Sequence, residues 1–296
     1  MPRILCGQHS FEVERSVPSQ VYNRYRIGSI VEQDLNLTRF ELGFLAMHAK
    51  SIFRDFDAGS RLDLLQKVLS EDGDMEMLIA FSHLKMKGYV LKVEQDQLFY
   101  RKKDEKAWKG RLTVASEQDF LDLLHRTPDE ATTYSIVDGD GGTSMYDVAE
   151  AEPAGEMHHV SQTGSAVMLR GFRLAAGPLD HANMKKLGYD IYILDRPDLV
   201  DAGISVAMKD LVISDLGKRG IAARTGFKYG SDLRLYVKSV EDHAEYLLHI
   251  NDGARIKWYE IARAVRVASA VRKMFLVALF DNGKIRYFSV SRRIDV

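Results

Sequence analysis

The chain has 296 residues and a formal net charge of −1, with 46% hydrophobic residues, 28% charged residues and a single cysteine, Cys6. This composition predicts a soluble globular protein of about two domains. The lone cysteine excludes an internal disulfide and favours a reducing cytoplasm. No apolar run approaches the roughly 20 residues that span a bilayer, and the N-terminal residues lack the apolar core of a secretory signal. We therefore expect neither membrane insertion nor secretion.

Charge is distributed unevenly along the chain. Residues 127–160 contain eight Asp/Glu and no Lys/Arg, whereas residues 255–296 contain ten Lys/Arg and three Asp/Glu. A basic segment can bind a polyanion, and an acidic segment can dock on a basic surface of another copy. Two solvated faces that never meet would give the same pattern, so charge alone does not decide between these interpretations.

The first half of the chain contains two helix signals. Residues 35–56 have a helical period, with Thr38 or Asn36 as the candidate N-cap. Residues 83–108 have the pattern of a helix end, a glycine suited to the left-handed position after a helix, and two short strands closing on Tyr100.

A hairpin and a linker are predicted next. An amphipathic helix is expected from residue 117, followed by two strands around the turn DGDGG at 138–142. Residues 149–165 have the composition of a linker, and strands are expected within 164–175 and 188–195.

The second half repeats the order of the first. Residues 215–242 show a helix end, Gly220 and two strands closing on a tyrosine, and 258–290 show a helix and two strands around the turn DNG. We predict a mixed α/β (α+β) fold of two tandem pseudo-repeats, each with a helical or mixed N-terminal part and a small mixed sheet flanked by helices. The expected domains are 1–157 and 158–296, with a site-bearing subdomain at about 217–296.

The second half carries a tyrosine, a histidine and a lysine, of which the first half keeps only the tyrosine. Tyr236 matches Tyr100, but no histidine in the first half corresponds to His243, and Lys273 aligns with Glu130. An RNA phosphodiester can be cut by its own 2′-hydroxyl if a base, an acid and a positive charge surround it.

The chemistry of the three side chains suits that reaction, and each also has an ordinary structural explanation. Tyrosine serves as a base where a cation lowers its pKa, histidine as an acid, and lysine as the charge. Tyr236 can instead pack at the border of the core, and His243 can be an exposed loop residue. Lys273 can interact favourably with the negative end of a helix dipole. His249 is the competing histidine, although its place within a predicted strand favours a structural role.

The motifs around these residues resemble archaeal tRNA-splicing endonucleases of the homodimeric class with two repeats per chain. The segments are RTGFKYGSDLRLY, HAEYLLH, WYEIARAVRVASAVRK and FSVSR, in that order within 217–293. The resemblance implies a cytoplasmic enzyme that cuts precursor tRNA at both splice sites of a bulge–helix–bulge, leaving 2′,3′-cyclic phosphate and 5′-hydroxyl ends without a metal or other cofactor. By motif, Tyr236 resembles the general base, His243 the general acid and Lys273 the stabiliser of the transition state.

The same resemblance assigns RNA and dimer contacts. Arg266 matches one of two arginines that clamp a bulge base, and Arg292 is the candidate for the other, with Arg286 as its rival. Asp138 and Asp140 match a loop that holds two chains together, which would bring the acidic and basic segments of two protomers into contact. Two protomers would then supply two active sites.

Other classes of protein remain possible from the residues alone. A duplicated RNA-binding protein without catalysis would share the basic segment but would not need His243. A metal-dependent nuclease would need clustered carboxylates, for which Asp232 and Glu245 lack the usual spacing. A scaffold subunit would not need the triad.

Overall fold

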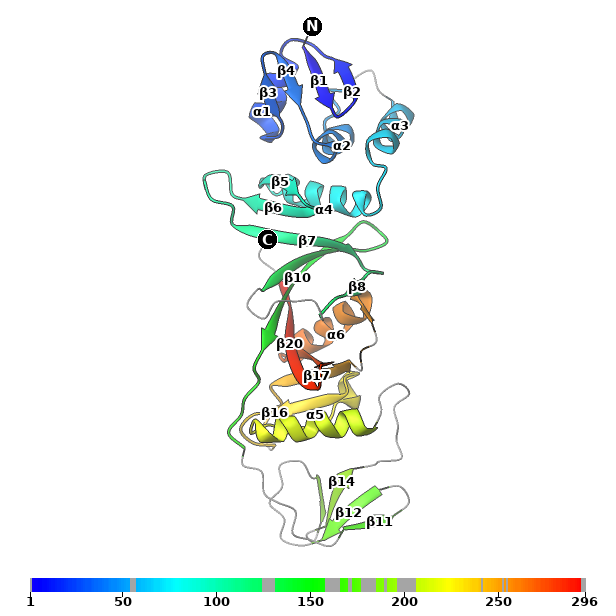
Figure 1. Ribbon diagram of the computed structural model, residues 1–296, viewed down its shortest axis with the longest axis vertical. Coiled ribbons are helices and arrows are strands. Elements are labelled where there is room, and N and C mark those ends of the chain that lie inside the picture. Colours follow the sequence, from blue (N-terminus) through cyan, green and yellow to red (C-terminus); the bar gives the residue numbers. More distant parts are fainter. Residues whose placement is uncertain are drawn as a thin grey trace. The chain divides into compact units, whose positions relative to one another are not determined.

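The computed structural model describes residues 2–53, 57–123, 131–157, 166–169, 172–176, 185–188, 191–195, 206–240, 242–251, 253 and 255–293. The chain divides into two compact units. The first comprises residues 1–119, 132–146 and 293–296, and the second comprises residues 120–131 and 147–292. The fold is mixed α/β, as the sequence predicts, and Figure 1 labels its elements. Among the described residues, no helix is long and apolar enough to cross a membrane.

The first unit begins with a small sheet and continues into a larger one. The small sheet has the strand order β2-β1-β4-β3. Its strands are β1 (Arg3–Cys6), β2 (His9–Glu12), β3 (Ser29–Val31) and β4 (Asp34–Asn36). The helices are α1 (Val17–Tyr25), α2 (Arg39–His48), α3 (Ala58–Val68) and α4 (Asp74–Met86). The larger sheet is formed by β5 (Val90–Glu94), β6 (Gln97–Arg101), β7 (Gly110–Ser116), β9 (Thr132–Val137) and β10 (Thr143–Ala151), whose last residues belong to the second unit.

The second unit contributes a run of five neighbouring strands of its own. Its strands are β15 (Ala222–Thr225), β16 (Leu233–Tyr236), β17 (Tyr246–Asn251), β19 (Met274–Asp281) and β20 (Lys284–Arg293). Helix α5 (Val206–Lys218) packs on β15, and α6 (Trp258–Ala270) packs on β19. A short 3-10 turn, η1 (Phe227–Tyr229), joins β15 to β16, and β18 (Ile256–Lys257) pairs with β8 (Phe120–Leu121). A separate sheet contains β11 (Ala166–Leu169), β12 (Phe172–Ala176), β13 (Lys185–Gly188) and β14 (Ile191–Asp195).

The five-strand runs of the two units have matching strand orders. One reads β5-β6-β7-β9-β10 and the other β15-β16-β17-β19-β20. The middle pair is parallel in both, β7 with β9 and β17 with β19. Gly88 and Gly220 follow α4 and α5 with φ of 89° and 73°, the left-handed conformation predicted from the sequence. Asn282 and Gly283 also have positive φ, as the predicted tight hairpin turn requires.

Two of the predicted helices differ from the structure. Over residues 35–53 the predicted helix is limited to α2, because residues 34–36 pair as β4 and Thr38 begins the helix with a capping box to Glu41. Residues 54–56 of the predicted helix lie outside the described residues. The helix expected from residue 117 is absent over 117–123, where a turn and β8 occur instead, and residues 124–130 lie outside the described residues. Leu121 is buried there by pairing with Ile256, a tertiary contact that overrides the local helical pattern.

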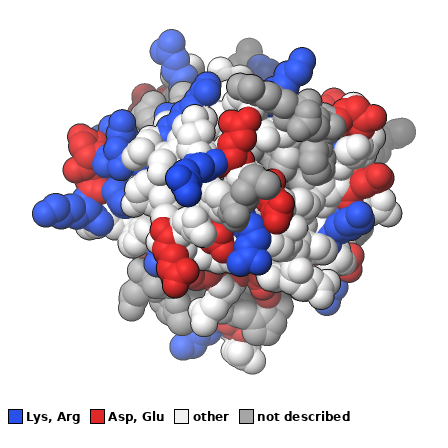
Figure 2. Space-filling view, turned by 90° about the horizontal axis from the view of Figure 1, so that it is seen from above, with Lys and Arg blue, Asp and Glu red and all other residues white. Residues whose placement is uncertain are grey.

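Apolar side chains from neighbouring strands form the core of the second unit. Leu235, Leu248 and Leu276 lie on β16, β17 and β19 and are at most 1% exposed. Helix α6 contributes Trp258 and Ile261 from its buried face. On the molecular face shown in Figure 2, basic and acidic side chains are interspersed. This face therefore carries no continuous patch of basic side chains among the residues drawn in colour.

Candidate active site

Tyr236 ends β16 and is buried, with 5% of its surface exposed. Its cross-strand partner is Ala222, and its ring packs with Ala222 and Ala244. The guanidinium carbons of Arg224 and Arg234 lie 5.7 and 5.9 Å from the ring centroid. The sequence reasoning missed these two cations, although residues two apart in a strand share a face and the pattern LRLY places Arg234 beside Tyr236.

His243 and Lys273 approach the same sheet edge from two other segments. His243 is exposed in the loop before β17, and half-buried Lys273 precedes β19 directly. The parallel register places Tyr246 opposite Met274, and Met274 N–H donates to the Glu245 carbonyl over 3.0 Å. The Lys273 ammonium donates a hydrogen bond to the backbone carbonyl of Ala244.

Ala244 is the common neighbour of the three predicted catalytic residues. It packs against the Tyr236 ring, accepts from Lys273 and is bonded to His243 in the chain. The end of β16 and the starts of β17 and β19 share one edge because β16 is antiparallel to β17, whereas β19 is parallel to it. The chain segments that carry a tyrosine, a histidine and a lysine thus meet at one edge of the sheet.

Two carboxylates of this sheet, one at each end of β16, are engaged by the backbone. Glu245 accepts from Val237 N–H over 3.0 Å and fastens the chain immediately after Tyr236. Asp232 accepts from Ile250 N–H over 2.8 Å and lies 3.0 Å from His249 Nδ1. Within the described part of the chain, no three His, Cys, Asp or Glu side chains form a group suited to a metal ion.

A backbone strap, residues 155–157, crosses the chain beside the start of β15 and the end of β16. Gly155 and Met157 N–H donate to the carbonyls of Arg219 and Gly220, over 2.8 and 2.9 Å. Glu156 N–H donates to the Val237 carbonyl over 2.8 Å. A Cβ at Gly155 would lie 2.2 Å from the Gly220 oxygen, so this crossing needs glycine.

The strap corrects the linker prediction where the structure describes it. Residues 149–151 belong to β10, and residues 155–157 carry the strap hydrogen bonds, whereas 158–165 lie outside the described residues. A composition typical of linkers therefore did not exclude a hydrogen-bonded segment that borders the candidate active site.

The arginines predicted to contact RNA occupy different environments. Arg266 is exposed on α6, and Arg292 is exposed near the end of β20. Arg286 is 17% exposed, pairs with both oxygens of Glu150 over 2.9 and 3.2 Å, and lies 3.3 Å from Asp281. These ion pairs raise the pKa of Arg286.

The acidic turn of residues 138–142 is internally organised. The Asp138 carboxylate accepts from the N–H groups of Asp140 and Gly142 over 3.1 and 2.7 Å. Glu117 accepts from Gly139 N–H over 3.3 Å. Asp140 is exposed at the tip of the turn. The turn therefore presents carboxylates on a preformed backbone.

A family model and several archaeal relatives match this chain. A family model described as tRNA intron endonuclease, catalytic C-terminal domain, matches residues 206–287. The tRNA-splicing endonuclease of Thermoplasma volcanium is 30% identical over 294 residues, covering 99% of this chain and 98% of the relative. That of Picrophilus torridus is 26% identical over 287 residues, covering 94% and 92%. That of Methanococcus vannielii is 39% identical over 89 residues, covering 29% and 50%.

The fold, the gathered side chains and these similarities define a nucleic-acid-cleaving enzyme of tRNA maturation. The chain belongs to the tRNA-splicing endonuclease family. The resemblance drawn from the sequence motifs is confirmed, as is an endonuclease activity in the removal of tRNA introns.

Proposed function

We propose that the protein cuts precursor tRNA at both splice sites of a bulge–helix–bulge by metal-free transesterification. Tyr236 takes the proton from the 2′-hydroxyl, whose oxygen then forms a bond to the adjacent phosphorus. The bond from phosphorus to the 5′-oxygen breaks, and His243 donates the proton that this oxygen needs. The products are a 2′,3′-cyclic phosphate and a 5′-hydroxyl.

The observation that carries this proposal is the meeting of three segments at Ala244. The bond from the Lys273 ammonium to the Ala244 carbonyl fixes the cation and leaves two further N–H donors for the phosphorane oxygens. The guanidinium groups of Arg224 and Arg234 lie beside the Tyr236 ring, so the proposed base stands next to two positive charges. The exposure of His243 suits an acid that must reach a leaving group on a large substrate.

We further propose that Arg266 and Arg292 stack on an unpaired base of the substrate. Both are exposed, and a guanidinium plane is a common partner of splayed RNA bases. Arg286, the rival of Arg292, is engaged by Glu150 and Asp281, so we assign it to the structure of the sheet.

We propose a cytoplasmic homodimer in which residues 1–157 form a non-catalytic repeat and 158–296 the catalytic repeat. The matching strand orders of the two five-strand runs support a duplication. Asp138 and Asp140 would bind basic residues of the partner chain, because the turn that carries them is preformed. Two active sites per dimer would serve two splice sites.

The test is cleavage of an intron-containing precursor tRNA in excess EDTA, comparing the wild type with His243→Ala. We expect two cuts with cyclic phosphate ends for the wild type and none for the variant. Cleavage only with added magnesium would overturn the metal-free mechanism. Binding without cleavage under either condition would indicate an RNA-binding protein instead.

A further inference from the structure

A pocket in the first unit combines cations with aromatic rings, and none of the residues assigned to catalysis lines it. The cavity measures about 370 Å³, within the range of ligand sites. Its walls come from the end of α1, the start of α2, strands β5 and β6, and the loop after β6. The lining residues that matter here are Tyr22, Arg26, Lys92, Arg101, Lys103 and Trp108.

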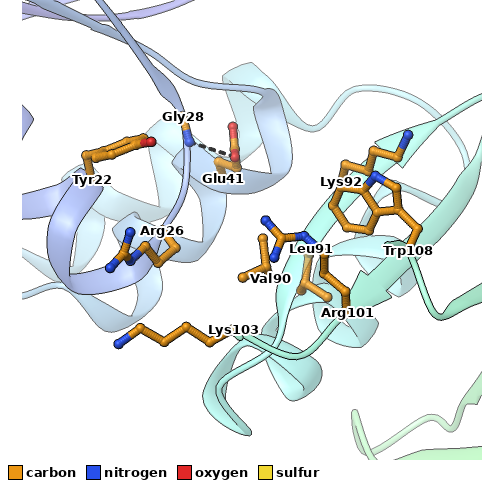
Figure 3. A pocket seen from close by; sticks show the side chains of 10 residues that line it. All are labelled: Tyr22, Arg26, Gly28, Glu41, Val90, Leu91, Lys92, Arg101, Lys103 and Trp108. Carbon is orange, nitrogen blue, oxygen red and sulfur yellow. Dashed lines mark hydrogen bonds between the residues drawn. The ribbon is translucent and has the colours of Figure 1, made fainter. Parts of the chain in front are cut away.

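The strand register places the cations beside an exposed indole. Val90 pairs with Arg101 and Lys92 with Phe99, so these four side chains share one face of the β5–β6 ribbon. The Lys92 ammonium lies 4.8 Å from the Phe99 centroid and 5.0 Å from that of Trp108, and the Arg101 guanidinium carbon lies 5.4 Å from Trp108. Trp108 nevertheless remains 39% exposed. Figure 3 shows Arg26 and Lys103 on one side of the pocket, Lys92 and Trp108 on the other, and Arg101 between them.

The pocket is preformed because its two walls are joined by a buried lysine. Lys85 Nζ donates to the carbonyls of Arg26 and Tyr89 over 3.3 and 3.1 Å, which ties the turn after α1 to the start of β5. Gly28 completes that turn at φ 74°, where a Cβ would lie 2.7 Å from the Asn36 oxygen. A site already shaped loses less entropy when it binds.

The one carboxylate that lines the pocket is engaged by three donors. Glu41 accepts from Gly28 N–H and Thr38 N–H, both over 2.8 Å, and from the Thr38 hydroxyl over 3.1 Å. Its negative charge is opposed by Arg26, Lys92, Arg101 and Lys103. Lys92 is also paired with Glu94 at 2.9 Å on the surface. The lining is therefore positive on balance and suits an anion.

We propose that this pocket binds an unpaired nucleotide of RNA, with its base on Trp108 and its phosphate among Arg26, Arg101 and Lys103. Cations that follow a phosphate and a ring that stacks on a base are the two parts of single-strand recognition. The aromatic surface favours RNA over an acidic peptide, which needs charge but no stacking partner. This site rests on the proposed function, because that function supplies the RNA. Its lining residues include none of Tyr236, His243 and Lys273.

Tryptophan fluorescence tests the proposal directly. The chain has two tryptophans, and Trp258 is fully buried, so quenching by a ligand reports on Trp108. The probe is single-stranded oligoadenylate, added to the full chain carrying His243→Ala so that no cleavage occurs. We expect the quenching to saturate as oligoadenylate is added. The affinity derived from it should fall about tenfold when Arg26→Glu or Lys103→Glu is introduced, and the affinity of these variants should depend less steeply on salt concentration. Trp108→Ala removes the fluorescent reporter, so its affinity for oligoadenylate is measured by filter retention. That affinity should fall about tenfold or more.

Matched controls separate this site from general charge effects and from the active site. Lys67→Glu reverses an exposed charge on α3, outside the pocket, and should leave the affinity unchanged. Oligoglutamate should not quench, and equal quenching by it would overturn base recognition in favour of an acidic peptide. Absence of quenching in a protein that still cleaves precursor tRNA would refute the pocket alone. Quenching without cleavage in the otherwise wild-type chain would refute the proposed catalysis and leave the pocket intact.

Discussion

His249 Nδ1 lies 3.0 Å from the carboxylate of Asp232, whereas His243 projects from the exposed loop before β17. Asp232 also accepts from Ile250 N–H, so His249 belongs to a small polar cluster that fastens β17 to the start of β16. The two histidines of the motif HAEYLLH are therefore placed for different tasks.

Substituting each histidine in turn should separate those tasks. We expect His243→Ala to slow single-turnover cleavage by roughly 10²–10⁴-fold, the usual contribution of a general acid, with little change in thermal stability. His249→Ala should lower the free energy of unfolding by about 1 kcal/mol and keep the cleavage rate within a few-fold. The reverse pattern would transfer the acid role to His249.

Tyr236→Phe should remove catalysis and keep the fold. The ring packs with Ala222 and Ala244, and Phe retains that packing, so the unfolding free energy should change by less than about 1 kcal/mol. The cleavage rate should fall by roughly 10²–10⁴-fold because the hydroxyl is the proposed base. As a comparison, Tyr236→Ala should cost about 3–5 kcal/mol in stability. A fully active Phe variant would exclude Tyr236 as the base.

The C-terminal arginines should divide into one that stabilises and one that binds. Arg286→Ala leaves Glu150 and Asp281 without a half-buried cation and should lower the unfolding free energy by about 2–3 kcal/mol. Arg292→Ala, at an exposed position, should change stability by less than about 0.5 kcal/mol and weaken binding of an uncleaved bulged RNA. Denaturant melts and filter binding measure the two effects, and unchanged RNA affinity for Arg292→Ala would refute its assignment.

The proposed dimer contact can be tested without disturbing the turn. Asp138→Asn keeps the oxygen that accepts from Asp140 and Gly142, so the double variant with Asp140→Asn removes charge and retains shape. We expect its self-association, measured by sedimentation, to weaken about tenfold or more, with a reduced salt dependence. If the double variant dimerises like the wild type, these carboxylates do not lie at the interface.

Lys85 should make the free energy of unfolding increase as the pH rises above about 8. Burial, the largest cause, lowers its pKa to about 8 from an ordinary value near 10.5, while Glu41 raises the pKa and Arg101 lowers it. The charged form is therefore disfavoured in the folded state, and its full cost applies below pH 8. As the pH rises toward 10.5 the unfolded chain binds more protons than the folded one, so stability increases by up to about 3 kcal/mol. The free energy of unfolding, relative to Lys85→Met, should rise over this window, and a flat difference would contradict the lowered pKa.

Local signals in the sequence were enough to predict many elements. Gly88, Gly220 and the Asn282–Gly283 turn were recognisable because each depends on the conformation of one or two residues. Thr38 was one of the two predicted N-cap candidates, with Asn36, and the structure places the cap at Thr38, although the periodic pattern around it extended the predicted helix too far.

The meeting of the candidate catalytic residues was not predictable in the same way. It depends on the parallel register between β17 and β19, which brings Lys273 to the Ala244 carbonyl, and no single segment encodes that register. The pairing of Leu121 with Ile256 is a similar case, since a contact distant in the chain decided the local structure. The sequence motifs predicted which residues belong to the site, and the order of β16, β17 and β19 brings their segments together.

The strap at residues 155–157 has a consequence for how the protein folds. Its partners, Gly220 and Val237, are translated long after it, so its hydrogen bonds close a large loop and cannot form until β16 has been made. Helix α5 and β15 involve nearer neighbours and can assemble sooner. A nascent chain therefore cannot close the strap before residue 237 has emerged, and the candidate active site is completed later still, once residues 243 and 273 follow.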